Sequence, residues 1–271
     1  MPDLVFNFHN SIRRYCMERR SIWAGKYSAI QSGGRDRVGR VYTDEALATF
    51  PRYIILDAIL EEIERYRPSE FACLEDAKEF YKIVVRDTNS DRGPSEGLAK
   101  NAIDEERALL ENFIERQDID ELSDVRPLFY RRRLSDTEDA VIRAELKERW
   151  HVDDYWFPLN EFRPKNVEAF QDTHFESEVG SDKIATILAS RGVERVWVVQ
   201  ETGTTYELDA TEIEPYYRYG GVECFWCDDS YDWIIYVSHE RSVTVGGWLL
   251  AEVKASWPNW SARLWTSWDF E

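Results

Sequence analysis

The stretch that decides the fold runs from Val222 to Trp257 and reads VECFWCDDSYDWIIYVSHERSVTVGGWLLAEVKASW. Aromatic and β-branched residues, which favour strands, dominate three short runs within it, separated by polar turn-forming residues, at 223–227, 233–237 and 242–245. After Gly246 and Gly247 the apolar residues recur at helical spacing, until a proline ends the run. The stretch therefore predicts three antiparallel strands followed by a helix that packs on one face of the sheet.

The same stretch carries a resemblance to a known group of proteins. A Trp-led strand, Ser-His-Glu, a short strand, Gly-Gly and a helix ending in Trp-Pro follow one another at Asp232, Trp233, Ser238, His239, Glu240, Gly246, Gly247, Trp257 and Pro258. This pattern resembles the C-terminal segment of uncharacterised bacterial proteins, some of which belong to toxin-immunity-type families. It covers about an eighth of the chain. The resemblance implies binding to a partner protein, and it brings no catalytic residues with it.

Upstream of this stretch the apolar spacing is mostly helical. Stripes at three- and four-residue steps predict helices within 4–31, 52–67, 74–85, 95–117 and 136–150. Thr43 is placed as an N-cap, and Ser135 with Glu138 forms a capping-box sequence. Pro51 is expected to split its segment, because the residue before a proline avoids the helical region.

The segment from residue 151 onward combines helices with strands. We expect a helix that opens near Asn166 and a second that is capped by Ser181. Residues 194–201 (ERVWVVQE) read as a strand with a hairpin partner at 205–208. The prediction is an α+β protein: a helical region over 1–150, then 151–271 with a small, mainly antiparallel sheet and flanking helices, packed together as one body.

Charge is distributed unevenly along the chain. Residues 1–150 contain 25 basic and 30 acidic residues, a net charge of −5, whereas 151–271 contain 9 and 22, a net charge of −13. An acidic surface repels the phosphates of nucleic acids and attracts a basic protein. Solubility alone is the simpler explanation of the same surface.

The composition also indicates the cellular compartment in which we expect the protein. No apolar run approaches the ~20 residues of a membrane helix, and the first residues lack a basic start followed by the apolar core of a signal peptide. We therefore expect a cytoplasmic protein that does not bind a membrane. Four cysteines in 271 residues do not form a disulfide framework.

Three common motifs of nucleotide-binding and catalytic sites are absent from the sequence. It contains no phosphate-binding loop, no dinucleotide fingerprint and no nucleophile elbow. Cys224 and Cys227 have the spacing of metal or redox sites, but side chains three apart on a strand point to opposite faces. We therefore expect ordinary thiols, no metal site and no cofactor.

Two further features allow a functional and a structural interpretation. His239 is the one weak catalytic candidate; it lies in a predicted tight turn, and neighbouring residues of such a turn do not converge as a triad does. The basic run Arg131–Arg133 fits either contact with nucleic acid or a short edge strand guarded by charge, and we favour an edge strand or a linker.

The C-terminal tryptophans give the strongest indication of binding. Five of them lie within the last 24 residues: Trp248, Trp257, Trp260, Trp265 and Trp268. Exposed indoles with an acidic rim are typical of protein interfaces, whereas indoles that cover the sheet would be structural. The candidate binding residues are Asp228, Asp229, Asp232, Trp260, Trp265 and Trp268.

These observations favour a non-enzymatic, acidic protein-binding module, an immunity or antitoxin-like inhibitor of a basic partner protein. The alternative is a hydrolase-type enzyme that uses His239 and nearby carboxylates. A third hypothesis is an acidic mimic of nucleic acid, which would bind no nucleic acid directly. Neither the partner nor the oligomeric state follows from the sequence.

Overall fold

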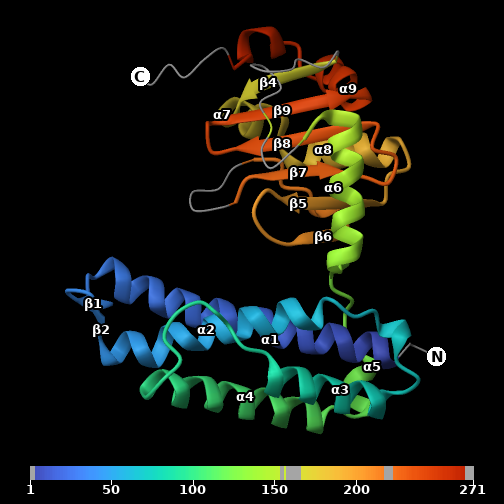
Figure 1. Ribbon diagram of the computed structural model, residues 1–271. Coiled ribbons are helices and arrows are strands. Elements are labelled where there is room, and N and C mark those ends of the chain that lie inside the picture. Colours follow the sequence, from blue (N-terminus) through green and yellow to red (C-terminus); the bar gives the residue numbers. More distant parts are fainter. Residues whose placement is uncertain (1–3, 153–155, 157–165, 217–221, 266–271) are drawn as a thin grey trace. The chain divides into compact units, whose positions relative to one another are not determined.

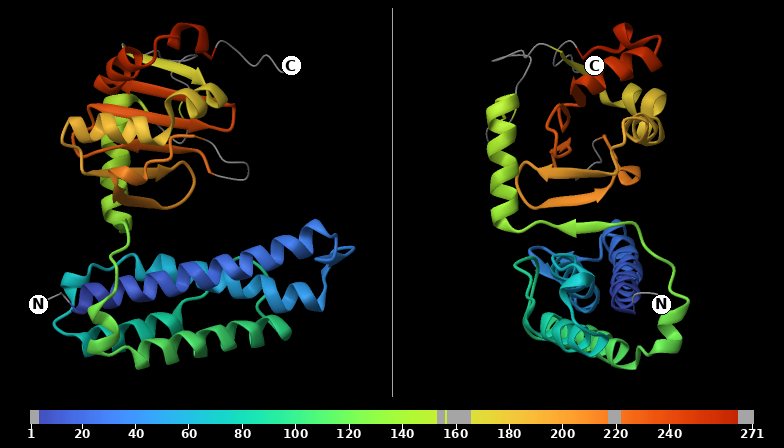
Figure 2. Two further views of the ribbon diagram at one scale, coloured as in Figure 1. Left: turned by 180° about the vertical axis from the view of Figure 1, so that it is seen from behind. Right: turned by 90° about the vertical axis from the view of Figure 1, so that its right-hand side faces the viewer.

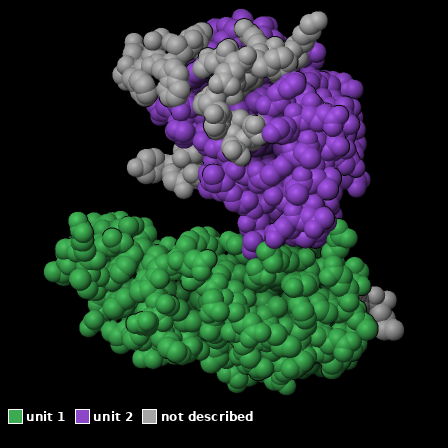
Figure 3. Space-filling model, viewed as in Figure 1, with its two compact units in different colours: residues 1–128 green, residues 129–271 purple. Residues whose placement is uncertain are grey.

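The computed structural model describes residues 4–152, 156, 166–216 and 222–265. The chain forms two compact units, residues 1–128 and 129–271 (Figure 3). The sequence pattern predicts the change of region at residue 150. In the structure, residues 129–150 belong to the second unit, because they contribute an edge strand and a helix that packs on its sheet.

The first unit is helical (Figure 1). Its elements are α1 (Leu4–Ser32), a hairpin of β1 (Arg37–Val38) and β2 (Val41–Tyr42), α2 (Asp44–Ile63), the short 3-10 helix η1 (Pro68–Glu70), α3 (Leu74–Asp87), α4 (Leu98–Arg116) and α5 (Ile119–Ser123). The apolar stripes of the long helices meet in one core. Phe8, Ile59, Tyr81 and Leu110 are fully buried there, each from a different helix.

Helix α2 confirms one local prediction and corrects another. The side chain of Thr43 accepts a hydrogen bond from the Ala46 backbone N–H at 3.3 Å, as an N-cap does. The helix continues through Pro51, where we expected a break. Pro51 is buried against its neighbours, so tertiary packing offsets the lost backbone hydrogen bond.

The second unit is built on a seven-stranded antiparallel sheet in the order β3-β6-β5-β7-β8-β9-β4. The strands are β3 (Arg131–Arg133), β4 (Val167–Gln171), β5 (Arg195–Gln200), β6 (Thr205–Asp209), β7 (Cys224–Cys227), β8 (Trp233–Ser238) and β9 (Ser242–Gly247). The segment that decides the fold supplies β7, β8 and β9 as expected, and every residue of β8 is buried.

Helices cover both faces of this sheet (Figure 2). Helix α6 (Asp136–Trp150) packs on one face through Ile142, Leu146 and Trp150. Helices α8 (Gly180–Ser190) and α9 (Trp248–Ser256) pack on the other. Shorter pieces complete the unit: α7 (Asp172–His174), the π-helix η2 (Phe175–Val179), and the 3-10 helices η3 (Ala210–Glu212) and η4 (Trp260–Arg263). The α+β class of the chain is thus confirmed.

One of the two edge strands agrees with the prediction from the local sequence, and the other does not. Arg131–Arg133 forms the expected short edge strand, which pairs with β6 at one end of the strand order. Residues 167–171, where we expected a helix, form the other edge strand instead. The helix prediction was wrong because this segment pairs along its whole length with β9 and buries Val167, Ala169 and Phe170 in the core.

The capping box that opens α6 is present. Ser135 and Glu138 exchange hydrogen bonds between their side chains and backbone N–H groups. Within the described part of the chain, none of the helices is both long enough and apolar enough to cross a bilayer.

Candidate functional site

Three neighbouring strands of the second unit bring two carboxyl groups and a hydroxyl group together at one end of the sheet. Glu201 follows β5, Glu223 precedes β7, and Ser238 ends β8. Gln200 pairs with Cys224, and Cys224 pairs with Val237. The adjacent residues Glu201, Glu223 and Ser238 therefore lie side by side in the following row of the sheet. Neighbours in one row point to the same face, so the register alone brings their side chains together.

Glu223 is the centre of the cluster. Its Oε1 atom accepts hydrogen bonds from Ser238 Oγ at 2.7 Å and from the backbone N–H of His239 at 3.1 Å. The ring Nδ1 of His239 lies 2.8 Å from the same oxygen, and Nε2 lies 3.0 Å from Oε1 of Glu240. One carboxylate thus holds the β8–β9 turn in place.

A second carboxyl group meets Glu223 at the hydroxyl of Tyr236. The Tyr236 Oη atom lies 3.2 Å from Glu201 Oε1 and 3.2 Å from Glu223 Oε1. A phenol has only one proton to donate. The Tyr236 hydroxyl can therefore donate a hydrogen bond to one of the two carboxylates at a time. The other carboxyl group is more stable in this position when it is protonated.

The pKa values follow from this crowding. Burial raises the pKa of Glu201 to about 7, and its contact with Glu223 acts in the same direction. Burial opposes ionisation of Glu223 as well, but hydrogen bonds from Ser238 and the His239 backbone outweigh it and lower its pKa. The contact with Glu223 raises the pKa of His239. Near neutral pH the crowding therefore favours a proton on Glu201, while Glu223 stays ionised.

The carboxylates beside His239 favour the protonated form of its ring. Its side chain is 58% exposed, and both ring nitrogens contact carboxylates. The geometry agrees with the expectation that Ser238, His239 and Glu240 do not form a triad, since Ser238 and His239 both donate to Glu223 and not to each other. The group can hold and release a proton, and it can bind a positive charge.

The three aspartates predicted to bind a partner lie apart from this cluster and differ from one another. Asp228 is buried, and its carboxylate accepts from the backbone N–H and the hydroxyl of Ser230, which closes the turn before β8. Asp229 is exposed. Asp232 is also exposed and pairs with Arg149 at 3.4 Å. Only the latter two present their carboxylates to solvent.

The predicted binding tryptophans lie against the sheet where the structure describes them. Trp260 is half-buried, packs on the core beside α9 and has the Lys254 ammonium 4.1 Å from its ring centroid. Trp265 is half-buried and donates its indole N–H to the Glu240 carbonyl at 3.2 Å. Trp265 thus reaches the same turn as the carboxylate cluster. Trp268 lies outside the described residues.

The cysteine pair has the opposite-face geometry that we predicted. Cys224 packs beside the core under α8 and α9, and Cys227 lies in the core under α6. Burial raises the pKa of Cys224 to about 12 and raises that of Cys227 further, so neither is a reactive thiolate. Among the described residues, no group of three His, Cys, Asp or Glu side chains has the arrangement of a metal site.

Sequence reasoning missed Glu201 and Glu223 as members of a site. Each is the terminal residue of a predicted strand and lies directly outside the observed one, and nothing in the local pattern distinguishes it from a solvated carboxylate. The signal was available only through the register of β5 and β7. No protein-family model, curated protein or solved structure matches this chain, so the site is interpreted from its geometry.

Proposed function

We propose that this protein binds a basic partner protein through its second unit, as an immunity or antitoxin-like inhibitor does. In this proposal Glu201, Glu223 and Glu240 bind a lysine or arginine side chain of the partner. The observation that carries the proposal is the convergence of Glu201 and Glu223 on one hydroxyl group, that of Tyr236. Two carboxylates in this position favour a cation, which would replace the proton of Glu201.

The charge of the unit supports the same function. Residues 129–271 contain 15 basic and 27 acidic residues, a net charge of −12. Asp229 and Asp232 add exposed carboxylates on the same unit. Such a surface accelerates the approach of a basic protein, and a desolvated ion pair at its centre slows dissociation.

The test compares capture by matched variants of the tagged protein. The cluster variant is Glu201→Gln with Glu240→Gln, which leaves Glu223 in place to hold the turn. The control is Glu176→Gln with Glu194→Gln, which removes two exposed carboxylates elsewhere in the unit. Each is incubated with a lysate of the source organism at low and moderate salt, after its fold is checked by circular dichroism.

We expect the wild type and the control to retain one basic protein in near-equal amount, more strongly at low salt. The cluster variant should lose it. Equal capture by the cluster variant would remove these carboxylates from the interface, and the absence of any stoichiometric partner would overturn the proposed function.

A hydrolase is the second candidate, favoured by one observation. The pKa of Glu201 is raised to about 7, which is the value that suits a general acid or base near neutral pH. This function predicts turnover of an ester, amide or glycoside that both Glu201→Gln and His239→Ala abolish. Activity that survives both substitutions, or no turnover in a substrate panel, would exclude it.

A further inference from the structure

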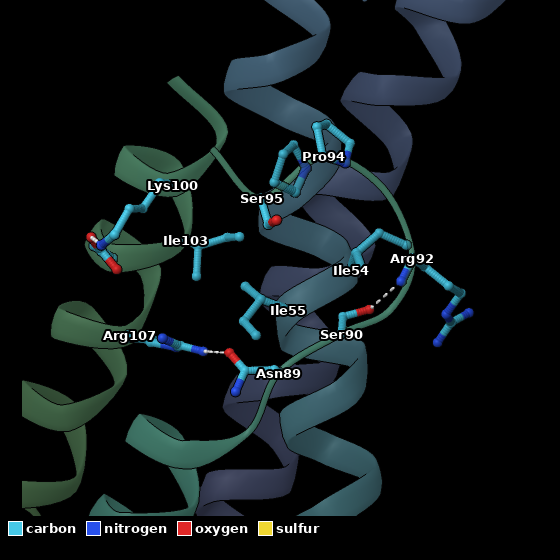
Figure 4. Close-up of a pocket in the computed structure, with 12 residues that line it drawn as sticks. Ile54, Ile55, Asn89, Ser90, Arg92, Pro94, Ser95, Lys100, Ile103 and Arg107 are labelled. Atoms are coloured by element: carbon cyan, nitrogen blue, oxygen red, sulfur yellow. Dashed lines mark hydrogen bonds and ion pairs between the residues drawn. The ribbon is translucent and has the colours of Figure 1, made fainter. Parts of the chain in front are cut away.

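The helical unit contains a cavity of about 130 Å³ between α2, α4 and the loop that joins α3 to α4 (Figure 4). Its floor is apolar. Ile54 and Ile55 come from α2, Ile103 comes from α4, and Pro94 comes from the loop. An engineered apolar cavity of about 150 Å³ binds benzene, so this space matches a compact apolar group of that size.

The wall of the cavity carries one arginine, Arg107, whose hydrogen bonds are to neutral groups. Arg107 of α4 donates through Nη2 to the Thr88 carbonyl and, at 3.3 Å, to Asn89 Oδ1. Figure 4 shows its guanidinium directed at Asn89 of the loop. These bonds fix the group in one orientation. Its Nε atom is enclosed, yet it meets no acceptor among the described residues.

Among the residues that the structure describes, Arg107 also has no countercharge. Among the half-buried or buried arginines of this unit, Arg13 pairs with Glu64, and Arg19 and Arg52 pair with Glu106, whereas Arg14 donates to the Arg126 carbonyl. No carboxylate in the described part of the chain forms an ion pair with the guanidinium of Arg107, although the protein has a net charge of −18. A half-buried, fixed and unpaired cation is a costly arrangement that an anion would relieve.

The other cations of the lining are already neutralised. Lys100 pairs with Asp104, which also lines the cavity. Arg92 pairs with Asp57 at 2.9 Å, and Figure 4 shows its side chain extending away from Ile55 and Ile103. Arg107 is therefore the group left to bind a ligand, and the hydroxyl of Ser95 lies across the isoleucines from it.

We propose that this cavity binds a small organic anion. The compact apolar part of the ligand lies on Ile54, Ile55 and Ile103, and its carboxylate or phosphate group accepts hydrogen bonds from Arg107. A second hollow of about 360 Å³ continues along α4 and shares Asp104 and Arg107 with the first. The anionic group therefore lies at the junction of the two hollows, where a larger ligand has room to extend.

The experiment is isothermal titration of the full-length protein with four probes. Benzoate and phenyl phosphate have both the ring and the charge. Inorganic phosphate has only the charge, and benzamide has only the ring. We expect saturable one-to-one binding of benzoate or phenyl phosphate, at least tenfold tighter than that of inorganic phosphate or benzamide. The better of the two anions identifies the ligand as a carboxylate or a phosphate ester.

Matched variants assign the binding to this cavity. Arg107→Gln should weaken binding at least tenfold, whereas Arg116→Gln, which makes the same charge change at an exposed position of the same helix, should change it less than twofold. Ser95→Phe, at an exposed lining position, should fill the cavity and block binding without disturbing the core.

Several results would overturn the proposal. These are no saturable binding of either aromatic anion, equal affinity for benzamide, or binding that both Arg107→Gln and Ser95→Phe leave intact. Because the cavity lies in the helical unit, the outcome is independent of partner binding by the second unit.

Discussion

His239 and Glu223 form a two-point contact at the end of the sheet. The ring Nδ1 atom lies 2.8 Å from Glu223 Oε1, and the backbone N–H of the same histidine donates to that oxygen at 3.1 Å. The carboxylate therefore holds the turn and favours the protonated form of the ring. This relationship links the fold of the β8–β9 turn to the protonation of the cluster.

The first prediction concerns the pKa of His239, which the contact with Glu223 raises. Glu223→Gln should lower this pKa toward its ordinary value of about 6.5, as measured by NMR titration of the imidazole ring. Glu240→Gln should lower it less, because the contact with Glu223 is the larger cause. A pKa that is the same in the wild type and in Glu223→Gln would show that the ion pair does not form in solution.

The second prediction concerns the dependence of stability on pH. The pKa of Glu201 is raised from 4.5 to about 7 in the folded protein. The folded state therefore binds the proton more tightly than the unfolded state, and the contribution is present below pH 4.5 and lost as the pH rises through 7.

Glu201→Gln should remove this loss, because glutamine does not ionise. Between pH 5 and pH 8, the free energy of unfolding of the wild type should fall by about 1 to 2 kcal/mol more than that of the variant, a value that allows for solvent screening. Urea denaturation at both pH values measures it. Glu194→Gln should behave as the wild type does, and a parallel pH dependence in Glu201→Gln would contradict the prediction.

The third prediction concerns the buried ion pair of Arg13 and Glu64. Arg13 Nε and Nη2 lie 3.1 and 3.0 Å from Glu64 Oε1, and the two side chains are 3% and 2% exposed. Glu64→Leu should cost about 3 to 5 kcal/mol, because it removes the carboxylate that faces the buried guanidinium of Arg13. The double variant with Arg13→Met should recover more than half of that loss.

Denaturation followed by circular dichroism at the helix signal checks this. The control is the more exposed pair Arg86–Glu111, where Glu111→Leu should cost less than about 1 kcal/mol. Equal costs at the two sites would mean that burial does not determine the strength of these pairs.

The fourth prediction contrasts two glycines. Gly247 joins β9 to α9 with φ +71°, and an added Cβ would lie 2.0 Å from the Asp232 carbonyl oxygen. Gly247→Ala should therefore cost about 3 kcal/mol. Gly25 lies inside α1 with open space around it, so Gly25→Ala should stabilise by about 0.5 to 1 kcal/mol. Thermal denaturation checks both predictions: the midpoint should fall in Gly247→Ala and rise in Gly25→Ala. Shifts of the same sign in the two variants would contradict them.

Much of the fold was predictable because its determinants are local. Apolar spacing located the helices, and side chains at Thr43 and Ser135 marked where two of them begin. Alternation and β-branched residues located β5 to β9. Each of these signals acts over a few neighbouring residues, so the sequence alone is sufficient to show it.

Tertiary structure decided the rest. Residues 167–171 became a strand because β9 offered hydrogen bonds along their whole length, which outweighed the local helical pattern. Asp228 became a buried turn residue rather than a surface charge. Glu201 and Glu223 met because the register of β5 against β7 placed them in one row. Register is a property of paired strands, so the site existed in the sequence only as separate carboxylates, and the assembled sheet brought them together.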